Sequence, residues 1–146
     1  MKLNFIWDKK QEMDEVDIKA HPVNKEKLEL LKQGLYSSMT LNVQNPKNNR
    51  KLRIDIQQVE VIVSLGHLSK TILVSKEEYI LQKRLKELQT LEENGFFRIN
   101  NSTILNLSQV DSFSSGEYAR LEVFTKNNNR YLVSRHYAKL IKERLL

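Results

Sequence analysis

The side chains in this sequence that could do chemistry form neither a catalytic nor a metal-binding pattern. The chain has no cysteine, which excludes a disulfide framework, a thiolate zinc site and Cys-based catalysis. The three histidines, His21, His67 and His136, stand 46 and 69 residues apart, so they form no short ligand pair. There is no G-x-S-x-G motif, no phosphate-binding glycine loop and no clustered acid–base set. The sequence predicts no enzyme, no metal, no cofactor and no small-molecule substrate.

Positive charge is the more informative chemical feature, because it is confined to one part of the chain. Residues 1–45 carry seven lysines and seven acidic residues and are neutral. Residues 46–146 carry 17 basic and 11 acidic residues, and the difference is the whole net charge of +6. A basic excess suggests a polyanionic partner such as nucleic acid, which would meet the C-terminal two thirds of the chain.

Length and composition restrict the class of protein. A chain of 146 residues with 40% hydrophobic residues, 4 Gly and 2 Pro is globular, and its length fits one domain with a small appendage. Its apolar runs are far shorter than the roughly 18 residues that a membrane helix needs. The start, MKLNFIWDKKQ, lacks the features of a secretory signal, so we expect a cytoplasmic protein.

The N-terminal third reads as a small β-β-α piece. Short strands are predicted over Lys2–Ile6 and Val16–Ala20, and leucines at helical spacing predict a helix over Lys25–Tyr36 with Asn24 as its N-cap. A piece of this size cannot fold alone. We therefore expect residues 1–38 to form an extension that packs either on the rest of the chain or on a second copy of it.

Residues 39–146 are predicted to form a second domain that is mostly β. Its alternating apolar and polar residues predict strands over Thr40–Gln44, Lys51–Ile56, Val59–Leu65, Thr71–Ser75, Phe96–Arg98, Thr103–Leu107, Tyr118–Thr125 and Tyr131–Ser134. A helix is predicted over Lys76–Leu91, with a Ser75–Glu78 capping box and a stop at Asn94-Gly95. A basic helix, His136–Leu145, ends the chain, with Tyr137, Leu140, Ile141 and Leu145 expected to face inward.

Two phrases in this domain resemble the LytTR family of bacterial DNA-binding domains. FFRINNSTILNLSQVDSF, residues 96–113, matches the family form F-x-R-x-x-[RN]-S-x-[IL]-[VL]-N-L. YLVSRHYAKLIKERL, residues 131–145, resembles the later form [LV]-x-V-S-R-x-[YF]-x-x-x-L, with Tyr131 and Ile141 at its first and last positions. The resemblance covers about residues 40–146. The neutral N-terminal third resembles the prefix of stand-alone members that lack a receiver domain.

The resemblance implies a mainly β (α+β) fold with about ten short strands in three small antiparallel sheets and few short helices. Such a domain inserts loops into DNA grooves. The implied function is a sequence-specific transcription regulator that reads repeated half-sites as a dimer or as adjacent monomers. The implied partners are promoter DNA, a second copy of the chain, and a small membrane protein that restrains it. The alternative is a protein-interaction or sequestration module that has lost DNA reading.

The resemblance also implies which residues meet DNA. Arg135, in the V-S-R phrase, would read bases, because a guanidinium can bind guanine O6 and N7 together; its alternative role is a surface or capping arginine. Asn101 would bind a phosphate, or else close an Asx turn. The first loop leaves three candidates open. The full predicted set is Arg135, Asn101, His67, Ser69, Lys70, Asn100, Ser102, Ser134, His136 and Lys139.

Aromatic and aliphatic residues of the two phrases are predicted to form core rather than base-stacking surfaces, because they alternate with polar residues. These are Phe96, Phe97, Ile104, Leu107 and Tyr137. Lys142 and Arg144, on the last helix, could either steer phosphates or form an ordinary solvated face. The loop Lys126–Arg130, with three asparagines between two cations, is expected to be an exposed hairpin tip.

Overall fold

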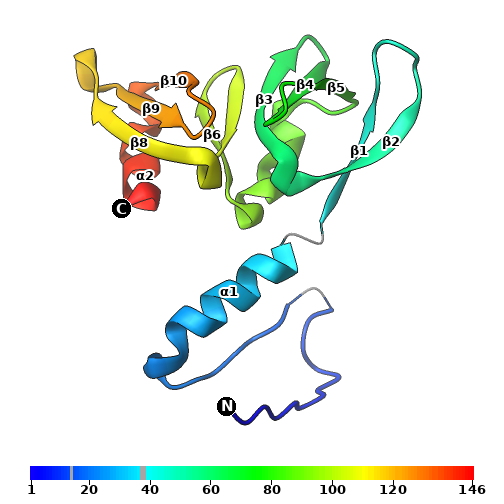
Figure 1. Ribbon diagram of the computed structural model, residues 1–146, viewed down its shortest axis with the longest axis vertical. Coiled ribbons are helices and arrows are strands. Elements are labelled where there is room, and N and C mark those ends of the chain that lie inside the picture. The colour runs from blue at the N-terminus through cyan, green and yellow to red at the C-terminus, as the bar shows by residue number, and fades with distance from the viewer. Residues whose placement is uncertain (14, 37–38) are drawn as a thin grey trace. The chain divides into compact units, whose positions relative to one another are not determined.

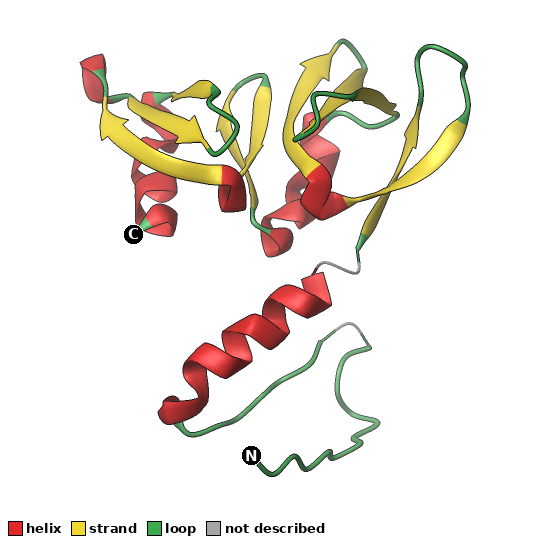
Figure 2. Ribbon diagram, viewed as in Figure 1, coloured by secondary structure: helices red, strands yellow, loops and turns green. Residues whose placement is uncertain are grey.

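The computed structural model describes residues 1–13, 15–36 and 39–146, shown as ribbons in Figures 1 and 2. The chain divides into two compact units, Met1–Gly34 and Leu35–Leu146. The predicted division, 1–38 against 39–146, has its boundary at residue 38, outside the described residues, and it stays a prediction.

The N-terminal unit contains the predicted helix but not the predicted strands. Helix α1 spans Lys25–Tyr36, as expected. It follows a 3₁₀ turn, Pro22–Asn24, which His21 caps by accepting a hydrogen bond at Nδ1 from the Val23 N–H at 3.2 Å. The prediction of Asn24 as the N-cap is therefore wrong. No strand is present in residues 1–13 and 15–20, so the β-β prediction is also wrong for the described part. An alternating segment forms a strand only where a second strand pairs with its backbone, and none does so in these residues.

The described residues of the larger unit form ten strands in two antiparallel sheets. One sheet has the order β2-β1-β5-β4-β3-β7-β6, and the other has the order β10-β9-β8. The strands are β1 Thr40–Gln44, β2 Lys51–Asp55, β3 Val59–Leu65, β4 Leu68–Leu73, β5 Glu78–Leu81, β6 Phe96–Asn100, β7 Thr103–Asn106, β8 Val110–Ser115, β9 Leu121–Thr125 and β10 Arg130–Val133. The mainly β fold is confirmed. The sheets number two rather than three, because β3 pairs with β7 and joins all of β1–β7.

Helical elements are short. A 3₁₀ helix spans Leu85–Asn94, helix α2 spans Arg135–Leu145, and 3₁₀ turns occupy Ile56–Gln58, Leu107–Gln109 and Glu117–Ala119. The Leu85–Asn94 helix stops at Gly95, whose φ of 87° is a left-handed conformation that favours glycine, so the predicted stop is confirmed.

Two hydrophobic cores share one wall, formed by β3, β6 and β7. Ile62, Phe96 and Ile104 belong to the core that also holds Leu85 and Leu88. Their chain neighbours Val61, Phe97 and Leu105 belong to the second core, with Val123, Val133 and Ile141. Successive residues of a strand face opposite sides, so consecutive apolar pairs are what a strand between two cores requires. The predicted core roles of Phe96, Phe97 and Ile104 are confirmed, and Leu107 and Tyr137 pack at the edge of the second core.

The helix predicted over Lys76–Leu91 is wrong in its first half. Residues Glu78–Leu81 form β5, which pairs with β4 on one side and with β1 on the other. As a strand, this segment supplies hydrogen-bond partners to the backbone N–H and C=O groups of both neighbours. The Ser75–Glu78 capping box is replaced by a turn in which Ser75 Oγ binds Glu77. Strand β8 was not predicted. Leu140 of α2 is 40% exposed rather than inward, whereas Ile141 is fully buried.

Candidate nucleic-acid interface

The two family phrases meet in space through a pair of hydrogen bonds. The Ser134 N–H, at the start of α2, donates to the carbonyl oxygen of Ile99 at 2.8 Å. The side chain of Asn100 donates from Nδ2 to the carbonyl oxygen of Leu132 at 3.1 Å. The β6–β7 turn and the junction between β10 and α2 therefore lie side by side and form one polar surface, although 32 residues of sequence separate Asn100 from Leu132.

The β6–β7 turn is braced from within, and the bracing leaves one asparagine exposed. Asn100 Oδ1 accepts from the Ser102 N–H at 3.0 Å and from Ser102 Oγ at 3.1 Å, which makes Asn100 the Asx-turn residue. Arg98 donates to the carbonyl oxygens of Asn100 and Asn101. Asn101 does not close the Asx turn, and its exposed amide is available to an external partner.

A two-residue hairpin turn, Gly66-His67, lies beside the β6–β7 turn. Strand β3 pairs with β7 up to Val63–Thr103, and the Ser64 N–H donates to the Ser102 carbonyl oxygen at 2.8 Å. Gly66 has a φ of 61°, which suits a glycine at this turn. The turn presents His67 to solvent, three residues beyond Ser64.

Arg84 is a cation at this turn that the sequence analysis missed. Its guanidinium donates to Nδ1 of the exposed His67 at 2.5 Å. Arg84 falls within the helix predicted over Lys76–Leu91. In the structure, β5 pairs with β4 through Ser69–Leu81, and Arg84 follows β5 beside the turn. The sequence shows two adjacent cations, Lys83 and Arg84, but only the pairing of β5 with β4 determines what these side chains face.

Two of the three candidates in the first loop are not at its tip, because the turn is only two residues long. Ser69 lies in β4, fully buried, and its hydroxyl donates to the Lys83 carbonyl oxygen at 2.6 Å. Lys70, also in β4, is half-buried and forms an ion pair with Glu78 at 3.6 Å. We leave Ser69 out of the interface because it is buried and its hydroxyl already has a partner.

The N-terminal end of α2 carries most of the remaining predicted residues. Ser134 is half-buried in the N-cap position, while Arg135 and His136 are exposed in the first turn. Lys139 is exposed four residues after Arg135, hence on the same face of the helix. The N-terminus of a helix attracts anions, and this attraction adds to that of the positively charged side chains. Arg144, by contrast, stacks over the Phe97 ring at 5.4 Å near the other end.

A buried carboxylate holds the second sheet onto the first. Glu60, 1% exposed on β3, accepts at Oε2 from the Tyr131 hydroxyl and from Asn129 Nδ2, both at 2.7 Å. Burial and the hydrogen bond to Glu60 raise the pKa of the Tyr131 hydroxyl. Asn127 also donates to the Val74 carbonyl oxygen at 2.9 Å. Asn127 and Asn129 of the 126–130 loop are therefore half-buried contacts, whereas Lys126, Asn128 and Arg130 are exposed as predicted.

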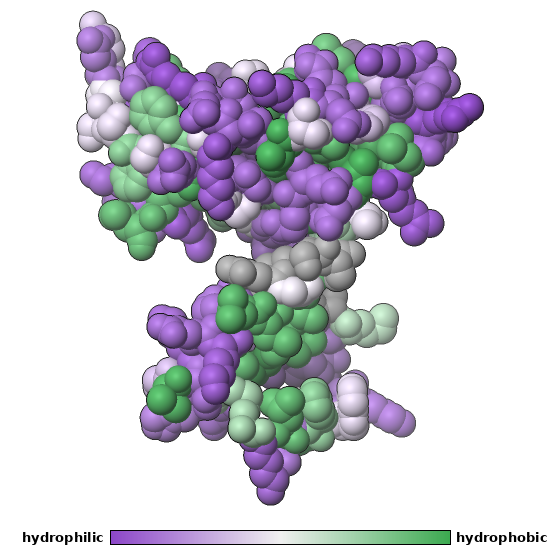
Figure 3. Space-filling view, in the orientation of Figure 1, coloured by the Kyte–Doolittle hydropathy of each residue, from purple (hydrophilic) through white to green (hydrophobic). Residues whose placement is uncertain are grey.

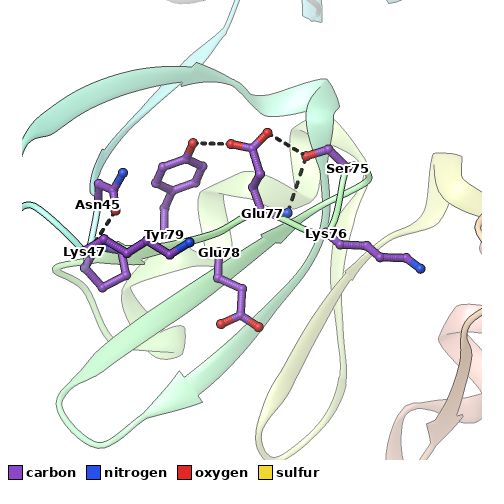
Figure 4. A pocket seen from close by; sticks show the side chains of 8 residues that line it. Asn45, Lys47, Ser75, Lys76, Glu77, Glu78 and Tyr79 are labelled. Carbon is purple, nitrogen blue, oxygen red and sulfur yellow. Dashed lines mark hydrogen bonds between the residues drawn. The ribbon is translucent and has the colours of Figure 1, made fainter.

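A pocket of about 400 Å³ lies elsewhere, between the β1–β2 and β4–β5 loops (Figure 4). Lys47, Lys76, Glu77 and Tyr79 are among its lining residues. The Tyr79 hydroxyl donates to Glu77 at 2.6 Å, which raises its pKa. The β4–β5 loop lies at the opposite end of β4 from the His67 turn, so the pocket is not part of the polar surface described above. In the described residues no group of His, Asp and Glu could hold a metal ion, and no helix could cross a membrane.

Comparison with known proteins gives the family. The model of the LytTr DNA-binding domain matches residues 49–146, so the chain belongs to this family and carries a DNA-binding domain. The structure is similar to the LytTr DNA-binding domain of a Bacillus cereus response regulator, with a TM-score of 0.64 and 15% identity over 73% of this chain and 95% of that one. Two Staphylococcus aureus proteins, from strains MSSA476 and MW2, are 28% identical over 99% of this chain and 98% of their own length. Both are named as uncharacterized HTH-type transcriptional regulators.

Proposed function

We propose that the protein is a transcription regulator that reads repeated DNA half-sites through three adjacent loops. The observation that carries the proposal is the placement of His67, Asn101 and Arg135 on neighbouring turns. Hydrogen bonds from Ser64 to Ser102 and from Ser134 to Ile99 join these turns. A row of exposed polar and cationic groups along one edge is suited to successive contacts along a duplex.

Each loop has a separate role in this proposal. Arg135 binds a guanine edge in the major groove, where two parallel hydrogen bonds give the commonest specific contact. Asn101 binds a backbone phosphate. His67 reaches a second groove position, and Arg84 beside it adds a cation for the phosphate backbone. Lys139 and the N-terminus of α2 contribute attraction without sequence choice. The protein would act in the cytoplasm and catalyse no reaction.

The N-terminal unit supports a role in association with a second copy. Trp7 is 91% exposed and Phe5 is 73% exposed, and their rings stack with centroids 6.2 Å apart. Figure 3 shows hydrophobic residues gathered on one face of this unit. Two such aromatic side chains alone offer roughly 300–400 Å², which is comparable with the largest apolar patch of a typical monomer. A neutral extension adds no net charge repulsion between copies.

The same apolar surface is the observation that favours the second candidate, a module that binds a protein partner and not DNA. A small membrane protein, implied by the family resemblance, stays a prediction as that partner. The two candidates differ in a direct measurement. A regulator selects a preferred duplex from a random DNA library, whereas a sequestration module selects none.

The test measures binding by fluorescence anisotropy, using the duplex selected from the library and a scrambled duplex at several salt concentrations. We expect tight binding to the selected duplex, weaker binding to the scrambled one, and a steep fall of both affinities with salt. Equal affinity for the two duplexes would contradict sequence reading. An absence of binding at low salt would favour the sequestration module.

A further inference from the structure

A fourth loop, Gly116–Arg120, lies at the same edge as the three loops already described. It connects β8 to β9, and Leu121, which follows it, pairs with Ser115 on one side and with Val133 on the other. Val133 immediately precedes Ser134 and Arg135. The pairing therefore places the β8–β9 loop and the N-terminus of α2 at one end of the three-stranded sheet (Figure 1).

The backbone of this loop is held in an unusual conformation. Tyr118 and Ala119 both have positive φ, 56° and 61°, although neither is a glycine. Such residues cost free energy and persist where the surrounding structure imposes them. Here the Gly116 N–H donates to the Arg120 carbonyl oxygen at 2.8 Å, and the Arg120 N–H donates to the Glu117 carbonyl oxygen at 3.1 Å. The loop is a closed turn with a defined shape.

The strained turn presents an aromatic and a cation to solvent instead of packing them. Tyr118 is 79% exposed, so its ring takes little part in packing. The guanidinium of the exposed Arg120 lies over its ring, 5.9 Å from the centroid. This contact limits the freedom of the arginine without using its N–H donors, which stay available to an anion.

We propose that Tyr118 and Arg120 bind the DNA phosphate backbone on the outer flank of the Arg135 contact. The proposal rests on the proposed DNA-reading function and extends the interface from three loops to four. Phenol and guanidinium groups are common phosphate donors and carry no sequence information by themselves. The loop would therefore add affinity and fix the position of Arg135, without changing which bases are preferred.

The charges around the loop match this role with one exception, which is useful experimentally. Glu122, on β9, is paired with Arg130. Glu117, in the loop itself, is exposed and would be repelled by a phosphate. If the loop faces the backbone, removing the negative charge of Glu117 must strengthen binding.

The experiment compares three charge variants of the full chain on the selected duplex and on its scrambled version. Arg120→Gln is expected to weaken binding to both duplexes several-fold and to reduce the slope of log affinity against log salt by about 1. Glu117→Gln is expected to strengthen binding to both. Lys126→Gln is the matched control, because Lys126 is exposed in the loop at the opposite end of the same sheet.

Tyr118 is tested by removing its hydroxyl and then its ring. Tyr118→Phe is expected to lose part of the affinity and Tyr118→Ala more of it, with thermal unfolding showing that each variant is folded. The proposal is overturned if Arg120→Gln binds like Lys126→Gln, or if Glu117→Gln does not strengthen binding. Either result leaves the three-loop function intact when the wild type still prefers the selected duplex. If the wild type shows no preference for the selected duplex, the proposed DNA-reading function itself is refuted.

Discussion

The backbone N–H of Ser134 donates a hydrogen bond to the carbonyl oxygen of Ile99 at 2.8 Å, and this bond joins two segments that are distant in sequence. Ile99 is fully buried in β6, two residues before Asn101. Ser134 is the residue before Arg135. The bond therefore couples the position of the proposed base-reading arginine to that of the proposed phosphate-binding asparagine.

Replacement of Arg135 by alanine should reduce sequence discrimination. The loss of a bidentate base contact costs about 1–3 kcal/mol for the preferred duplex and much less for other sequences. Competition binding between the selected and scrambled duplexes measures this difference. Lys142→Ala, on the exposed part of the same helix, serves as the control and should weaken both complexes equally. Equal losses for Arg135→Ala would assign that arginine to the phosphate backbone.

Alanine substitution should affect stability at Asn100 and DNA binding at Asn101. Asn100→Ala removes the exposed hydrogen bonds to Leu132 and Ser102, and should lower the free energy of unfolding by about 0.5–1.5 kcal/mol, the net contribution of a typical intramolecular hydrogen bond. Asn101→Ala should leave stability unchanged and weaken DNA binding. Urea unfolding and anisotropy on both variants test the pair. A stable Asn100→Ala variant would mean that the Asx turn does not hold the loop.

The Tyr131 hydroxyl should contribute stability that disappears at high pH. Its pKa is raised above the ordinary value of 10.0 in the folded state, so the folded protein favours the neutral phenol. The contribution is complete below about pH 10 and is lost as the pH rises toward the folded-state pKa. Tyr131→Phe should therefore be less stable than the wild type at pH 8, and the gap should narrow at pH 11. Urea unfolding at the two pH values checks this, and a constant gap would contradict it.

Exposed aromatics of the N-terminal unit should control self-association. The double variant Phe5→Ser, Trp7→Ser should shift the chain toward a monomer, because it removes two largely exposed apolar rings. Sedimentation velocity over a concentration series measures the change. Leu146→Ser, at an 86% exposed apolar residue outside this unit, provides the comparison. If the wild type sediments as a monomer throughout, the apolar surface packs within the chain or awaits another partner.

Local patterns predicted the elements whose neighbours in sequence are also their neighbours in space. The hairpin of β1 and β2 lies where the alternating residues predicted strands, since its pairing needs nothing outside the hairpin. Strand β5 shows the opposite case. Its residues have helical spacing, yet they pair with β4. The backbone N–H and C=O groups of a strand inside a sheet need partners, and this requirement outweighs the local helical pattern.

The sequence by itself determined the neutral extension, the basic domain and the two phrases that carry Asn101 and Arg135, because these depend on residue type and order alone. Only the tertiary structure decided what each polar residue near the turns faces. It buried Ser69 against the Lys83 carbonyl, made Asn100 a brace and brought Arg84 to His67. The physical reason is strand register: a shift of one residue turns a side chain to the other face, and register is set by partners far away in the chain.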